Sequence, residues 1–246
     1  MAINQITKII YPNPSAEGGY QEVALTDWSD RPLYSTADLF SRFTDEEIRL
    51  FSYTEGQNVV NTANMTDERQ ATLLDTNISA QSELDTTENF LLYAIALEVF
   101  EWTYSEQAGV GTFTIPNGGN MPTAPNQMVL HNRLICELDV SGKPFPQAGF
   151  GWFAQGFGPT FGAVFGDAAT LRTFANNGNP TAEARYMQSI PVHIGGTEDY
   201  NLLLLNPPET AVNFVDEAGQ TLTNRLMQVR AYLIGLHRRP VGAGGS

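Results

Sequence analysis

Three histidines are the side chains in this sequence best suited to bind a metal ion. His131, His193 and His237 lie far apart along the chain, each within or beside a segment that we expect to form a β-strand. An antiparallel sheet can bring such residues together, and imidazole is a common ligand of zinc, copper and iron. His131 and His193 fall on the outward-facing positions of their strands, however, which favours ordinary surface histidines over a metal site.

Two carboxylates and a thiol offer other chemistry in the middle of the chain. Glu137 and Asp139 point the same way on an expected strand, as the paired carboxylates of a glycosidase do. No sugar-stacking aromatic residue is expected on that face, so a solvated strand face is the favoured interpretation. Cys136, the only cysteine, falls on the inward-facing side, where a core residue belongs and a nucleophile does not. We therefore predict no enzyme, no metal site and no cofactor.

The strands that position these residues begin near Asn89. The segment from Phe90 to Tyr104 is expected to form a long strand, although its apolar spacing also fits a helix. The clearest strand pattern runs from Gln127 to Val140, where apolar and polar residues alternate as they do in an antiparallel strand with one buried face. Residues 145–166 predict two short aromatic strands separated by glycine bends.

The C-terminal third, from Arg185 to Val241, predicts four more strands. Apolar residues alternate over 190–194, and a second apolar run covers 202–205. The last strong segment is 227–237. The whole region from Asn89 onward then holds about eight strands, with turns at the spacing typical of a sandwich or barrel.

Two short helices are expected nearer the N-terminus. Thr36 precedes Leu39 and Phe43 at helical spacing, and residues 44–47 have the pattern of a capping box that opens a second helix. Gly56 is expected to end that second helix.

The predicted organisation is an N-terminal arm with short helices over residues 1–86 and an eight-stranded β-sandwich over residues 87–246. The chain carries a net charge of −14, which disfavours direct, strong binding of nucleic acid because phosphates are bound by basic surfaces. The best apolar run is too short for a membrane span. The first residues lack the pattern of a secretory signal.

Three C-terminal segments, 189–196, 199–205 and 229–241, carry a resemblance to a known family. They resemble the final strands of the jelly-roll capsid proteins of tailless icosahedral bacteriophages and related small viruses. The resemblance implies a mainly β fold, an eight-stranded antiparallel jelly roll with an N-terminal arm. It implies a structural protein that self-assembles into an icosahedral shell. Its partners would be copies of itself and other virion proteins. It would be located in the virion after synthesis in the host cytoplasm.

Two other functions also fit an all-β chain. One is a carbohydrate- or receptor-binding sandwich, with Trp152, Phe153 and Phe157 as the contact platform for a host-surface glycan. The other is a cupin-like or glycosidase-like enzyme, which requires converging histidine or carboxylate side chains.

Arg238 and Arg239 form a small basic spot at the end of the last expected strand and are the predicted subunit contacts. We predict that Arg238→Glu combined with Arg239→Glu impairs particle assembly, because the reversed charges repel an acidic neighbouring copy. Circular dichroism should show an unchanged fold. Normal particles from the double variant, seen by electron microscopy, would remove this contact.

Overall fold

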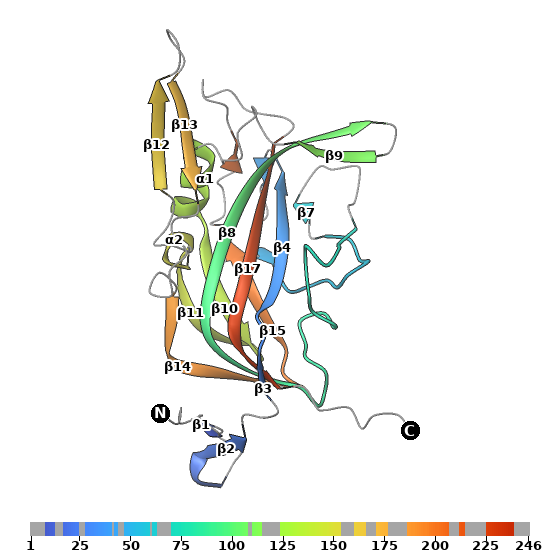
Figure 1. Cartoon of the computed structure of the whole chain (residues 1–246), viewed down its shortest axis with the longest axis vertical. Helices are drawn as coiled ribbons and strands as arrows, with labels where there is room; N and C mark the ends of the chain where they lie inside the picture. Colours follow the sequence, from blue (N-terminus) through green and yellow to red (C-terminus); the bar gives the residue numbers. More distant parts are fainter. Residues whose placement is uncertain are drawn as a thin grey trace, which may run out of the picture.

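In the described part of the chain, two main β-sheets, mostly antiparallel, pack face to face (Figure 1). The computed structural model describes residues 8–12, 17–24, 28–40, 42–43, 47–59, 61–62, 70–107, 110–114, 124–153, 160–165, 171–176, 186–206, 212–214 and 225–238. The mainly β class expected from the sequence is confirmed.

The larger sheet is curled, and its strands run in the order β14-β8-β17-β4-β7. Two short strands extend it, β3 beside β17 and β9 beside β8. The bounds are β3 Trp28–Asp30, β4 Leu33–Phe40, β7 Asn61–Thr62, β8 Asn89–Gln107, β9 Val110–Thr114, β14 Tyr186–Gly195 and β17 Arg225–Arg238. All of these ladders are antiparallel except the short one between β4 and β7.

The smaller sheet has the strand order β11-β10-β15-β6. Its strands are β6 Glu47–Arg49, β10 Ile135–Val140, β11 Lys143–Gly149 and β15 Tyr200–Leu205. Outside the two main sheets, the described residues form three two-stranded pairs and three short helices. These are β1 Lys8–Pro12 with β2 Tyr20–Ala24, β5 Arg42–Phe43 with β16 Val212–Asn213, β12 Thr160–Phe165 with β13 Leu171–Asn176, η1 Glu17–Gly19, α1 Ala124–Arg133 and α2 Phe150–Phe153.

The strand pairs of the two sheets are nested along the chain. β4 pairs with β17, β6 with β15, β8 with β14, and β10 with β11, its immediate neighbour in sequence. Two further ladders, β8 with β17 and β10 with β15, join these pairs into sheets. These four pairings join segments that lie progressively closer together along the chain.

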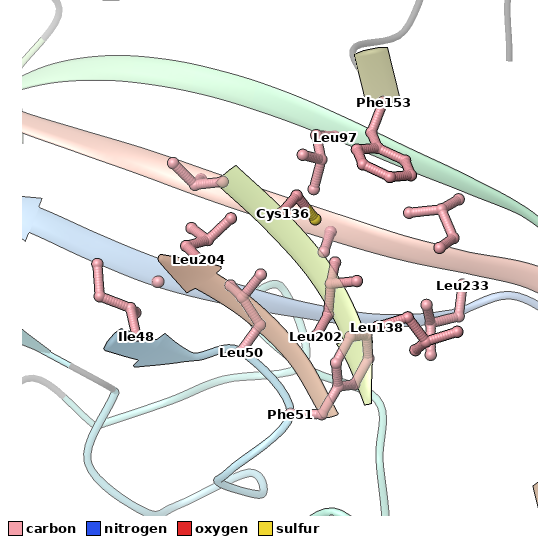
Figure 2. Close-up of a cluster of buried hydrophobic side chains, with 14 of the residues drawn as sticks. Ile48, Leu50, Phe51, Leu97, Cys136, Leu138, Phe153, Leu202, Leu204 and Leu233 are labelled. Carbon is pink, nitrogen blue, oxygen red and sulfur yellow. The ribbon is translucent and has the colours of Figure 1, made fainter. Parts of the chain in front are cut away.

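The core lies between the two sheets, because each presents one apolar face to the other. On β10 the side chains of Cys136, Leu138 and Val140 are buried and alternate with half-buried neighbours, as a strand with one covered face requires. Figure 2 shows Leu202 and Leu204 of β15 in the same cluster as side chains of the larger sheet. The inward position predicted for Cys136 is confirmed.

The N-terminal helices predicted around Thr36 and residues 44–47 are wrong in the part of the chain that the structure describes. Residues 33–40 form β4, which pairs along its length with β17. Residues 47–49 form β6, where Glu47 and Arg49 lie exposed and form an ion pair at 2.6 Å. These segments form strands because pairing with distant strands stabilises them more than their local preference for a helix does.

The predicted strand over 127–140 is half wrong, because its first half is the helix α1. Leu130 and Leu134 lie four residues apart, a spacing that suits a helix face as well as alternate positions of a strand. The Leu134 N–H donates to the Leu130 carbonyl at 3.1 Å, and both side chains are buried. Two aromatic strands are expected in 145–166. The described residues of this segment form the strands β11 and β12, with the helical turn α2 between them.

The long strand expected from Phe90 is confirmed as β8, and so are strands over 190–194, 202–205 and 227–237. The division of the chain at residue 86 stays a prediction. β4 and β6, which precede that residue, pair with β17 and β15, which follow it.

Gly235 allows β8 and β17 to approach closely at a bulge in their ladder. A methyl group at this position would lie 2.8 Å from two carbons of the Phe90 ring and would also clash with the Leu91 carbonyl oxygen. We predict that Gly235→Ala lowers the free energy of unfolding by about 1–3 kcal/mol, the usual cost of overpacking. Urea unfolding measures this effect. Gly149→Ala is the control, because nothing lies within 4 Å of its added methyl group, and equal losses in the two variants would contradict the prediction.

Candidate functional site

The three histidines occupy different elements, and each has a different neighbour. His131 lies on α1 with its ring edge-on to Phe150, at a centroid distance of 5.1 Å. His193 on β14 places Nε2 3.1 Å from Oδ1 of Asn89. The outward strand position predicted for His131 is wrong because that residue is helical. Among the described residues, no group of three or more His, Cys, Asp or Glu side chains is arranged to hold a metal ion.

His193 and His237 flank the same strand from opposite sides. His193 pairs with Leu91 of β8 in one ladder, and His237 pairs with Phe90 of β8 in the other. The side chain of His237 is buried and points into the sandwich, whereas that of His193 is half-buried.

The central carboxylates and the thiol have local structural roles. Gln147 Nε2 donates to the Glu137 carboxylate across the β10–β11 ladder, and the Gly142 N–H donates to Asp139 at 3.0 Å in the turn. Burial, and secondarily the charge of Glu137, raises the pKa of the Cys136 thiol well above its ordinary value. The thiol is therefore protonated at neutral pH and is a core group.

The predicted aromatic platform is only partly exposed. Trp152 is 66% exposed on α2, but Phe153 is fully buried in the core. Phe157 lies outside the described residues. The prediction for Phe153 is therefore wrong, and Trp152 is the exposed member of the platform among the residues that the structure describes.

A buried polar cluster at one end of the sandwich is the candidate site. His237 Nε2 lies 3.2 Å from Oε2 of Glu88, and both side chains are almost fully buried. The hydroxyl of Tyr200, the first residue of β15, is buried beside them without a hydrogen-bond partner among the described residues. Burial, then the charges of Glu88 and Asp199, raises the pKa of Tyr200, which is neutral in the ordinary pH range.

These three residues line a small cavity with a volume of about 10 Å³. Its wall is completed by Leu33 of β4 and by residues of the segment 77–84. The cavity is too small for an organic substrate, since a volume of about 10 Å³ holds roughly one water molecule. A histidine beside a carboxylate can, however, take up and release a proton.

Backbone contacts hold this end of the sandwich rigid. Ser82 has a left-handed backbone (φ 53°), and its carbonyl accepts from the Tyr200 N–H at 2.7 Å. Its hydroxyl accepts from Nδ2 of Asn201 at 2.9 Å. A methyl group at Gly196 would lie 2.7 Å from backbone atoms of Thr86. The segment before β8 is therefore fixed against the start of β15.

Sequence reasoning identified His237 but missed Glu88 and Tyr200. Glu88 is one of many acidic residues in a polar stretch, and no local pattern links it to a histidine 149 residues later. Of the two predicted contact residues, Arg238 lies half-buried on β17, where its backbone pairs with Trp28 and Asn89. Arg239 lies outside the described residues.

We predict that His131 makes the protein less stable as the pH falls. Burial lowers the pKa of His131 to about 4, whereas the unfolded chain takes up this proton near pH 6.5. Between these values the unfolded state binds more protons, so the free energy of unfolding should fall with pH by up to about 1.4 kcal/mol per pH unit. His131→Phe should remove this component, as measured by urea unfolding of both proteins at pH 7.5 to 4.5. A constant difference between the two curves would contradict the prediction.

No helix in the described part of the chain is long and apolar enough to cross a membrane. Comparisons with protein-family models, with curated proteins and with solved structures found no match to this chain.

Proposed function

We propose that this protein is a structural coat protein whose two sheets form an eight-stranded jelly roll. Jelly rolls place eight strands in two sheets by folding a long hairpin over on itself, and they are common in viral capsid proteins, lectins and cupins. The eight strands in the proposed roll are β4, β6, β8, β10, β11, β14, β15 and β17.

The nested strand order supports this proposal most strongly. Four strands in the order β14-β8-β17-β4 face four in the order β11-β10-β15-β6. The first strand pairs with the last, the second with the seventh, the third with the sixth and the fourth with the fifth.

The filled interior favours a coat protein over a cupin-like enzyme. In the described strands, the space between the sheets is occupied by apolar side chains such as Leu97, Leu138, Leu204 and Leu233 (Figure 2). A cupin-like or glycosidase-like site would place polar ligands among them.

The edges of the sheets indicate how copies of the chain would meet. β11 carries Pro144 and Pro146, and β14 carries Pro191 in a bulge where residues 188–191 leave the ladder with β8. Prolines and bulges at edges prevent sheets from extending into neighbouring molecules. Copies would therefore meet through side chains and loops instead of a continuous sheet.

Leu73 and Leu74 form one such projecting surface. They are 61% and 75% exposed at adjacent positions of a tight turn. Asp75 fixes the turn by accepting hydrogen bonds from the Thr72 N–H and hydroxyl at 2.9 and 3.0 Å, and the Tyr34 hydroxyl donates to the Leu73 carbonyl. A rigid apolar contact loses little conformational entropy on binding, which suits a repeated interface.

The test of the proposed function is the size of the purified full-length protein. We expect light scattering and electron microscopy to show regular particles at high protein concentration. A protein that stays monomeric, with no particles in any native source, would contradict the proposal.

We predict that Leu73→Ser combined with Leu74→Ser reduces particle yield at least tenfold, because the pair leaves water when copies meet. The free energy of unfolding should change by no more than about 0.5 kcal/mol, since neither side chain is buried within one copy. The matched control, Leu73→Met with Leu74→Met, keeps the surface apolar and should assemble. Equal yields from all three proteins would exclude this contact.

A further inference from the structure

The pair of His237 and Glu88 joins the two central strands of the larger sheet at the same end. His237 is the next-to-last residue of β17, and Glu88 immediately precedes β8. Only 1% of the His237 side chain and 10% of the Glu88 side chain are exposed. The Phe90 ring lies edge-on to the imidazole at 5.9 Å and limits its movement.

The same cavity brings together parts of both sheets. Tyr200 belongs to β15 of the smaller sheet, and Leu33 belongs to β4 of the larger one. A change in the interaction between His237 and Glu88 therefore acts where the sheets meet.

We propose that His237 is a proton-binding switch that strengthens this end of the sandwich as the pH falls below neutral. In the neutral histidine, Nε2–H donates to the Glu88 carboxylate. Uptake of a proton at the second ring nitrogen leaves that hydrogen bond in place and converts it into an ion pair. Charge-assisted hydrogen bonds are roughly twice as strong as neutral ones, and the new charge compensates the buried carboxylate.

The charged groups around the cavity favour the added proton. The segment 77–84 contributes Glu83 to the lining, β15 contributes the neutral Tyr200, and β4 contributes the apolar Leu33. Among the described residues that line the cavity, His237 is the only basic one. Asp30 of β3 pairs with Leu236, the residue before His237, and Arg238 follows His237 on β17. Burial opposes the charge, and the nearby carboxylates offset that cost.

His193 provides a matched comparison within the same molecule. It flanks β8 from the other side, but its partner is the neutral amide of Asn89. Burial lowers the pKa of His193, and the charge of Glu198 only partly opposes this. Acid should therefore stabilise the folded protein through His237 and destabilise it through His193, although both histidines lie beside the same strand. This inference does not depend on the proposed coat function.

The first test is a titration of the histidine rings of the full-length protein by nuclear magnetic resonance. We expect His237 to take up its proton with a midpoint above pH 6.5 and His193 below it. In Glu88→Gln the His237 midpoint should fall by about 1 pH unit or more, because the opposite charge is gone. A midpoint at or below pH 6.5, or one that Glu88→Gln leaves unchanged, would overturn the proposal.

The second test compares thermal unfolding of the natural protein and His237→Gln from pH 8 to pH 5.5. A proton held more tightly by the folded chain adds stability that is present below pH 6.5 and is lost as the pH rises through the folded-state midpoint. The Tm advantage of the natural protein should therefore grow by roughly 2–4 °C on acidification. The control, His193→Gln, should not show this growth. An advantage for His237 that stays constant or shrinks with acid would refute the switch.

Discussion

The ladder between β8 and β17 is the interaction on which the rest of the structure depends. It runs from Thr103 paired with Arg225 to Asn89 paired with Arg238. β17 also carries β4 and β3 on its other side, and β8 carries β14 and β9. Without this ladder the larger sheet would separate into two parts, and the smaller sheet would lose the apolar surface that it covers. The close approach at Gly235 and the pair of His237 and Glu88 are both features of this one contact.

The smaller sheet meets this surface with a strand that is buried almost throughout. β15 is covered on both faces along most of its length. It joins β10 to β6, and its first residue contributes to the cavity at the end of the sandwich. The apolar interior and the polar end are therefore supported by the same strand, which keeps the candidate site on a rigid framework.

Strands with a local pattern could be predicted from the sequence, and strands defined by distant partners could not. Alternation identified β14, and continuous apolar runs identified β8, β15 and β17. β4 and β6 were mistaken for helices because their apolar residues also fit helical spacing, and their partners lie far along the chain. The helix α1 was mistaken for a strand because Leu130 and Leu134 fit both patterns.

The candidate site was only partly visible in the sequence for the same reason. His237 stood out as one of three histidines, but its register in β17 decides that it points inward. Glu88 and Tyr200 reach it through two different strands, and their meeting depends on the pairing of the whole sheet. Local spacing carries no information about such a meeting.

The position of β17 in the chain has a consequence for biosynthesis. This central strand is synthesised after every strand that it pairs with. During translation, β4 and β8 therefore have uncovered apolar faces until β17 has been made. Pairings over such long sequence separations form slowly, and the exposed faces invite aggregation in the meantime. A chain interrupted before residue 225 lacks the strand that joins β4 to β8. The larger sheet can therefore form only after β17 has been synthesised, because this strand joins β4 to β8.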